Sequence, residues 1–383
     1  MREYLLVFLV ALSVTYLLTV FAREFALRTG AVAAVRDRDV HAEPIPYLGG
    51  VAMLGGLLAA FLVARHLPFL SRSDPYVFSD AAVVLGAGAL ICVVGVIDDI
   101  FDIDALTKFG GQLLAAVILV WFGVRFYFVE LPDGTQVVLG PLQGGILTVF
   151  LVIATINAVN FVDGLDGLAA GVVGVGALAF FVFSYVIADQ NNLTLATTGA
   201  LLSASLAGVC AGFLPHNFHP ARLFMGDSGS MLIGLVLSAG ALSLTGQFAP
   251  GDITSDGSSL FVTLLPAMLP VSVLMVPMAD LLLAVVRRTR AGRSPFSPDK
   301  QHLHHRLLEI GHSQRRAVYI MWMWAALLAS SAVVASLFRG PMVWLGLGTA
   351  TVVTVAMTFA LPQMKTPARF AAPRRELGGD DRL

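Results

Sequence analysis

Long apolar runs alternate with short polar loops along almost the whole chain. Most of the runs have about the 20 residues that an α-helix needs to cross a bilayer. Charged residues and Gly/Pro clusters separate them, and the fifth run is the shortest. The expected spans are residues 4–22, 47–66, 80–97, 109–125, 144–157, 167–187, 194–214, 229–246, 259–286, 317–337 and 342–361. The pattern predicts an all-α polytopic integral membrane protein with ten or eleven transmembrane helices.

The composition supports this class. Of the 383 residues, 57% are apolar and 13% are charged, which excludes an ordinary soluble domain. The net charge of −1 shows no basic excess, so nucleic acid is not an expected partner. No small-residue cleavage site follows the first run, which we expect to be a retained helix. We expect a single transmembrane domain over residues 1–362 and a disordered cytoplasmic tail over 363–383.

Arginine and lysine are distributed unevenly between the two sides of the expected helices. One set of loops and the C-terminal tail carry nineteen of the 24 basic residues, and the opposite set carries five. The positive-inside rule places the basic set in the cytoplasm and the N-terminus outside. The basic set comprises loops 23–46, 98–108, 158–166, 215–228, 287–316 and the tail. On the outer side, residues 126–143 contain turn residues between β-prone flanks, which predicts a small hairpin.

One strongly polar stretch lies at the end of an apolar run. Its polar residues, three apart, are Asn157, Asn160, Asp163 and Asp166. Four such side chains at a membrane boundary are costly unless they face water, a metal or a ligand. Gly164 and Gly167 predict a turn within the stretch. A bend there is expected to draw the four polar groups toward one spot.

Further carboxylates are expected on the same side of the membrane as this polar stretch. Asp98 and Asp99 are either solvated acids at a helix end or a pair whose repulsion a shared cation or proton relieves. Lys108 opens the next span, where it either snorkels or contacts a phosphate. Asp227 follows Gly226 at the start of the eighth span. It either caps that helix or binds a metal. In the second case, free amide N–H groups beside it could donate hydrogen bonds to a phosphate.

Two loops of this face are basic. Arg38 and His41 either provide positive-inside charge or form a basic rim that binds an anionic ligand. Loop 287–316 contains a denser group, made of His302, His304, His305 and Arg306. These histidines lack the spacing and the cysteines of a zinc site. The group is either a positive-inside loop or, as its hydrogen-bonding density favours, an anion site.

Taken together, these residue types indicate a chemistry. Carboxylates with amides and without cysteine suit a hard cation such as Mg²⁺ or Mn²⁺, and bases beside it suit a diphosphate. A site within a membrane suits a lipid co-substrate, which points to phosphoryl or prenyl transfer at the inner leaflet. Three other functions are alternatives. The first, a prenyltransferase, would need a second acid-rich motif of the form found at Asp98–Asp102. A secondary transporter would place charges near the midplane of the bilayer. An intramembrane aspartyl protease would need two acids within spans.

Four motifs in order make the chain resemble the polyprenyl-phosphate N-acetylhexosamine-1-phosphate transferases. They are Asp98–Asp99 with Lys108, Asn157–Gly167, Phe224–Ser230 and His302–Arg306. The resemblance implies a cytoplasmic active site, Mg²⁺, and transfer of a sugar-1-phosphate from a UDP-sugar to a polyprenyl phosphate, with release of UMP. The separated histidines are similar to those of members that use UDP-GlcNAc. The phospho-MurNAc-pentapeptide transferases, which tend to have three consecutive histidines, are the alternative.

The resemblance also implies roles for single residues. Asn160 and Asp227 are the expected metal ligands. The expected catalytic residues are Asp98, Asp99, Lys108, Asp163 and Asp166. The expected substrate-binding residues are Arg38, His41, Asn157, His302, His304, His305 and Arg306. The expected cofactor is Mg²⁺, with Mn²⁺ as a substitute. The expected partners are UDP-GlcNAc, a polyprenyl phosphate, the plasma membrane and, as the family allows, a second copy of the chain.

Overall fold

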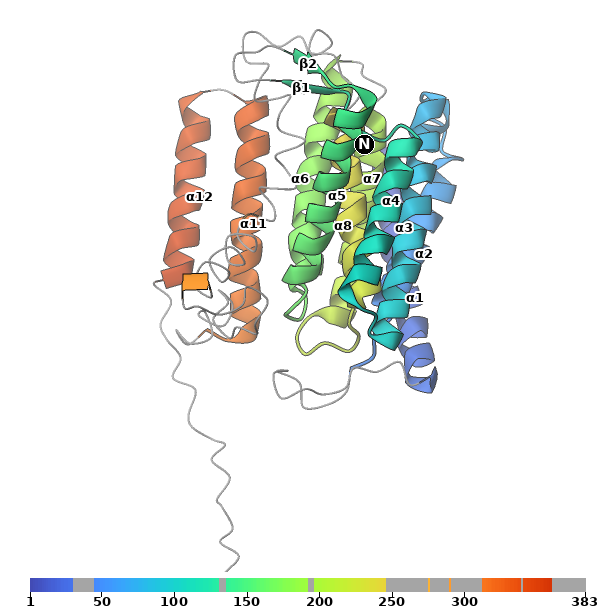
Figure 1. The fold of residues 1–383 in the computed structure, drawn as a ribbon. Helices are drawn as coiled ribbons and strands as arrows, with labels where there is room; N and C mark the ends of the chain where they lie inside the picture. The colour runs from blue at the N-terminus through green and yellow to red at the C-terminus, as the bar shows by residue number, and fades with distance from the viewer. Residues whose placement is uncertain are drawn as a thin grey trace, which may run out of the picture.

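The chain forms a bundle of long helices (Figure 1). The computed structural model describes residues 1–29, 45–130, 136–191, 196–245, 275, 289–290, 312–338 and 340–359. Their longer helices are α1 (Arg2–Thr29), α2 (Gly49–Ala64), α3 (Pro75–Phe101), α4 (Ala105–Trp121), α5 (Pro141–Val162), α6 (Leu168–Asn191), α7 (Ala196–Asn217), α8 (Gly226–Thr245), α11 (Gln314–Leu337) and α12 (Pro341–Phe359).

Seven helices in the described ranges are long and apolar enough to cross a membrane, and α2 and α4 are apolar but shorter. The seven are α1, α3, α5, α6, α7, α11 and α12. The predicted class, an all-α polytopic membrane protein, is confirmed. The ninth expected span lies almost entirely outside the described residues, as do Arg38, His41, the group 302–306 and the tail 363–383. The count of ten or eleven spans therefore stays a prediction.

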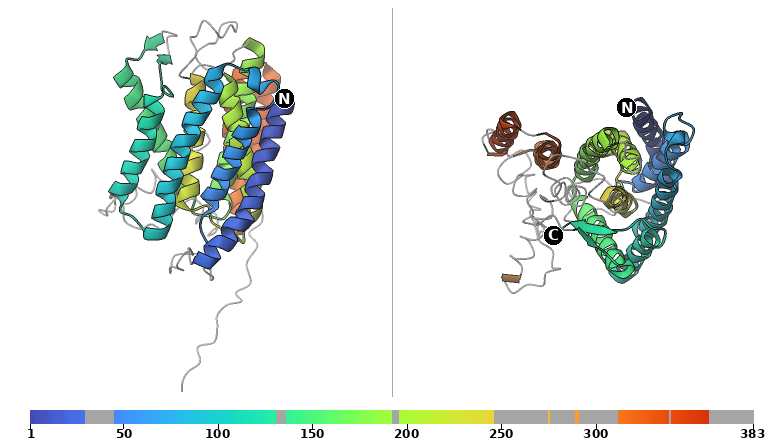
Figure 2. Two further views of the ribbon diagram at one scale, coloured as in Figure 1. Left: turned by 90° about the vertical axis from the view of Figure 1, so that its right-hand side faces the viewer. Right: turned by 90° about the horizontal axis from the view of Figure 1, so that it is seen from above.

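Helix α8 lies inside the bundle. It packs against α2, α3, α5, α6 and α7, and the view along the bundle shows the other helices arranged around it (Figure 2). Glycines make this packing close, because a Cβ on Gly50 or Gly95 would overlap the backbone of α8 at Ser228 and Gly229. The first turn of α8 is therefore held by the backbones of α2 and α3.

The two ends of the bundle differ. The N-terminus lies at the same end as the strands β1 (Phe128–Glu130) and β2 (Gln136–Val138), which pair antiparallel (Figure 1). The predicted hairpin is therefore confirmed. The C-terminal ends of α3, α5 and α7 and the start of α8 lie at the opposite end (Figure 1). The polar motifs of the described residues thus gather at one end of the bundle, as their spacing between the apolar runs predicts.

Candidate active site at the start of α8

Asp99, near the end of α3, caps the N-terminus of α8. Its carboxylate accepts hydrogen bonds from the N–H of Asp227 at 2.7 Å and from the N–H of Ser228 at 3.2 Å. Gly226 has a φ of +68°, and a Cβ there would overlap the Asp99 carboxylate. A carboxylate at this position satisfies helix N–H groups and interacts favourably with the helix dipole. The prediction that free N–H groups beside Asp227 could receive a phosphate is therefore wrong.

This cap predicts a stability effect. Asp99→Asn removes the negative charge and leaves a single oxygen to accept two N–H groups, so we expect the free energy of unfolding to fall by about 1–2 kcal/mol. Asp102→Asn is the matched control, because Asp102 is exposed and has a φ of +51°, which asparagine tolerates. Unfolding of both variants is followed in mixed micelles by circular dichroism. Equal stability of the two variants would contradict the cap.

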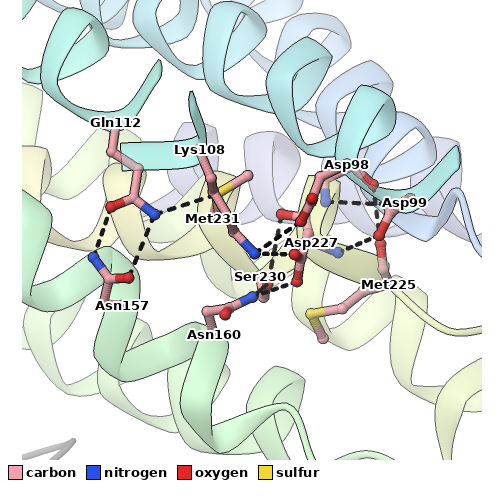
Figure 3. A network of polar contacts seen from close by, with 11 residues as sticks. Asp98, Asp99, Lys108, Gln112, Asn157, Asn160, Met225, Asp227, Ser230 and Met231 are labelled. Carbon is pink, nitrogen blue, oxygen red and sulfur yellow. Dashed lines mark hydrogen bonds and ion pairs between the residues drawn. The ribbon is translucent and has the colours of Figure 1, made fainter. Parts of the chain in front are cut away.

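The capped N-terminus of α4 fixes the position of Lys108. Asp104 caps that helix by accepting the N–H groups of Leu106 and Thr107, at 3.0 Å each, and its hydrogen bonds with Thr107 lower the pKa of Asp104. Lys108 follows in the first turn. Its Nζ lies 2.9 Å from Asp98 Oδ2 and also donates to Asp227 Oδ2 (Figure 3). One ammonium group therefore bridges carboxylates of α3 and α8.

Asn160 approaches Asp227 from α5. Its Nδ2 donates to Asp227 Oδ1 at 2.5 Å and to Ser230 Oγ at 2.9 Å (Figure 3). Residues far apart in the sequence thus meet around one carboxylate at the start of a buried helix. Five of the expected site residues therefore lie together: Asp98, Asp99, Lys108, Asn160 and Asp227.

Asp163 interacts electrostatically with the carboxylates of this group. It is half-buried and directly follows the end of α5. Desolvation, followed by the nearby charges of Asp227, Asp99 and Asp166, raises the pKa of Asp163 well above its usual value. A cation bound in this cluster would relieve that repulsion.

Asn157 lies one turn farther into the membrane and does not contact Asp227. Its Nδ2 donates to Gln112 Oε1 at 2.7 Å (Figure 3) and to Ile153 O at 2.8 Å. Gln112 is buried and lies one turn beyond Lys108 on α4. Gln112 is not among the site residues expected from the sequence, although a glutamine within an apolar span, four residues from Lys108, is a signal for it.

Asp166 supports the loop between α7 and α8. Its Oδ2 lies 2.8 Å from His219 Nδ1 and accepts the N–H of Ala221 at 3.1 Å, and its side chain is 1% exposed. Asn217 reinforces this contact by accepting the N–H of Gly167 and donating to Leu223 O. The predicted turn after Asn160 is present, but the prediction that it draws all four polar groups to one spot is wrong.

An apolar groove reaches Asn157, one helical turn from Asn160 on α5. It lies between α4 and α5, has a volume of about 670 Å³, and has Asn157 as its polar lining residue at the end nearest the cluster. Its other lining residues are Phe109, Leu113, Val117, Val120, Pro141, Leu142, Gly145, Ile146, Val149, Phe150, Ile153 and Ala154. Several are exposed on the side of the bundle, among them Leu142 and Phe150. An extended apolar chain is the ligand that fits such a surface.

Comparison with known proteins identifies the family. Residues 81–245, which contain the whole described cluster, match the model of glycosyl transferase family 4. The chain is also 47% identical, over 94% of its length and 88% of the relative, to decaprenyl-phosphate N-acetylglucosaminephosphotransferase of Mycolicibacterium smegmatis. The chain belongs to glycosyl transferase family 4.

More distant relatives in glycosyl transferase family 4 have similar names. The probable undecaprenyl-phosphate N-acetylglucosaminyl 1-phosphate transferase of Bacillus subtilis is 30% identical over 91% of this chain and 88% of the relative. The undecaprenyl-phosphate α-N-acetylglucosaminyl 1-phosphate transferase of Escherichia coli K12 is 29% identical over 84% of this chain and 81% of the relative. All three names combine a polyprenyl phosphate with N-acetylglucosamine, and none names a MurNAc-pentapeptide.

The cluster of this family 4 member fits a hard divalent cation. Its potential ligands are oxygen atoms, from the carboxylates of Asp98 and Asp227 and the amide of Asn160 (Figure 3). Within the described ranges, no group of three or more acidic, histidine or cysteine side chains is arranged to hold a metal ion. Mg²⁺ is commonly held by one or two carboxylates, with substrate phosphates and water completing its shell. The residues therefore suit a cation that binds together with a phosphate substrate.

Proposed function

We propose that the protein transfers GlcNAc-1-phosphate from UDP-GlcNAc to a polyprenyl phosphate and releases UMP. The observation that carries this proposal is the meeting of Asp227, Lys108 and Asn160 one helical turn from Asn157, the polar residue that lines an apolar groove. The carboxylates and the lysine suit a cation with a diphosphate, and the groove suits a lipid. The names of the relatives support the polyprenyl phosphate and the N-acetylglucosamine phosphate. The product would feed a cell-envelope polysaccharide.

We place the site on the cytoplasmic face of the plasma membrane and the N-terminus outside. Two observations support this orientation. The loops at the site end belong to the set that carries nineteen of the 24 basic residues. The N-terminus of α1 lies at the opposite end of the bundle (Figure 1). A homodimer stays a prediction from the family, and the mass of the particles in nanodiscs tests it.

The reaction forms a bond between a lipid-phosphate oxygen and the sugar-bearing phosphorus. The bond from that phosphorus to the bridging oxygen breaks, and UMP leaves with this oxygen. Mg²⁺, held by Asp227 and Asn160, would offset the charge of the diphosphate. Lys108 and Arg306 would hold phosphate oxygens, and His302, His304 and His305 would line the sugar-phosphate side.

The lipid phosphate is already a nucleophile, so the protein needs to position it and neutralise charge more than it needs a strong base. Asp98 would take the residual proton of the lipid phosphate on a carboxylate oxygen. Asp163 and Asp166 would shape the nucleotide pocket, Asp166 through the loop that it supports. The groove between α4 and α5 would hold the isoprene chain, with its phosphate end next to Asn157.

Product identity tests this proposal. Purified protein in detergent is incubated with polyprenyl phosphate, Mg²⁺ and UDP-GlcNAc. We expect equal amounts of UMP and a lipid whose mass has increased by one GlcNAc-1-phosphate, measured by mass spectrometry. A parallel reaction with UDP-MurNAc-pentapeptide is expected to give neither product, because the loop 302–306 has the separated histidines of the UDP-GlcNAc branch.

Each rival function predicts another outcome. Release of inorganic diphosphate would indicate prenyl transfer. Solute uptake into proteoliposomes without any turnover would indicate a transporter. Turnover of UDP-MurNAc-pentapeptide alone would show that the branch assignment is wrong, while leaving the transfer of a sugar-1-phosphate intact.

A further inference from the structure

Lys108 lies where a divalent cation would bind. Its Nζ is 2.9 Å from Asp98 Oδ2 and donates to Asp227 Oδ2, so the ammonium group neutralises both carboxylates (Figure 3). We propose that Lys108 holds this place in the substrate-free protein and leaves it when a diphosphate binds, so that cation binding depends on diphosphate binding. This inference rests on the proposed function and adds a positioning role for Lys108.

The shared atom is Asp227 Oδ2. The other oxygen of this carboxylate accepts a hydrogen bond from Asn160 at 2.5 Å, so Oδ2 is the oxygen that the lysine and an incoming cation compete for. The side chains are only 19% exposed for Lys108, 10% for Asp98 and 27% for Asp227. Water and salt therefore screen these charges poorly, and an ammonium group and a divalent ion repel each other strongly at adjacent positions.

Lys108 is the member of the cluster that can move. Asp99 is fixed by two N–H groups of α8, and Asn160 is fixed by Asp227 and Ser230. Lys108 has a flexible four-carbon stem and lies in the first turn of α4, at the edge of the cluster. Rotation of its side chain would free Asp227 Oδ2 without a change in the backbone.

A diphosphate provides the reason for this movement. Its oxygens offer the ammonium group a new anionic partner and offer the cation additional ligands. The diphosphate therefore favours the arrangement in which Lys108 has left Asp227 and the cation has taken its place. Because such coupling is reciprocal, the cation must also strengthen the binding of the diphosphate.

The test measures Mn²⁺ binding by electron paramagnetic resonance on purified full-length protein, without and with UDP, corrected for Mn²⁺ bound by free UDP. In the wild type, we expect UDP to tighten Mn²⁺ binding by about tenfold or more. In Lys108→Gln, we expect Mn²⁺ to bind about tenfold tighter than in the wild type without UDP, and UDP to add less than about threefold.

Two control variants separate this role from a general charge effect. Lys108→Arg keeps the positive charge and should bind Mn²⁺ as weakly as the wild type without UDP. Arg28→Gln removes a positive charge from the exposed ion pair between Arg28 and Glu24 on α1. This variant should keep the wild-type coupling between Mn²⁺ binding and UDP binding. Lys108→Met replaces Lys108→Gln if thermal unfolding shows that the glutamine variant is not folded.

Two results would overturn the inference. If a folded Lys108→Gln binds Mn²⁺ no tighter than the wild type without UDP, Lys108 does not compete with the cation. The transferase proposal would survive that result, since product identity tests it separately. If the wild type binds no Mn²⁺ even with UDP, both this inference and the divalent-cation part of the proposed function fail.

Discussion

Asp227→Asn is expected to lower turnover by about 10³-fold, because it removes the negative charge at the centre of the cluster. The substitution keeps the size of the side chain, the packing of α8 and the cap that Asp99 provides to the N–H of residue 227. It removes the carboxylate that meets Lys108 and Asn160, and with it the expected cation ligand. Turnover is measured as UMP release at saturating UDP-GlcNAc and polyprenyl phosphate.

Asp102→Asn is the matched control for this variant. It makes the same chemical change at an exposed carboxylate just beyond α3 and should keep turnover within about twofold of the wild type. The pair also separates two enzyme classes, because a prenyltransferase that used Asp98, Asp99 and Asp102 would lose activity in the control. If a folded Asp227→Asn kept more than about a tenth of the wild-type turnover, Asp227 would have no central role in charge stabilisation.

The helices could be predicted from the hydropathy pattern because the apolar runs are long and clearly separated. The errors lie at the polar ends. We expected the third span to end at residue 97 and the fifth at residue 157, but α3 continues to Phe101 and α5 to Val162. Charged and amide side chains end the apolar run without breaking backbone hydrogen bonding, so the helix continues through them. Asp99 and Asn160 are therefore helical residues with fixed orientations.

The site could be predicted only in part, because sequence spacing gives residue types but not the direction of each side chain. Asn160 and Asp227, 67 residues apart, meet because α5 packs against α8. Asn157 is three residues before Asn160 on α5, yet it turns to Gln112 of α4. Asp166 follows the turn and is directed to His219. These partners depend on tertiary packing, so a single motif cannot reveal which of its residues act together.

Removal of divalent cations is expected to lower turnover to the background rate, and added Mg²⁺ is expected to restore it. The physical reason is the balance of charge. Asp98 and Asp227 both meet Lys108, which is the one cation contacting this carboxylate pair in the described part of the chain. A diphosphate adds further negative charge, which a single ammonium group cannot offset. The measurement is UMP release after EDTA treatment and dialysis, followed by titration with Mg²⁺.

Two comparisons make this experiment decisive. The thermal midpoint should change little in EDTA, because Lys108, Asn160 and the α8 N–H groups hold the carboxylates without a metal. Ca²⁺ should restore much less activity than Mg²⁺, since it prefers longer bonds and more ligands than this compact cluster offers. Full turnover in EDTA would mean that Lys108 and the basic loop alone stabilise the leaving phosphate, and the role of Asp227 would then have to be electrostatic positioning of Lys108.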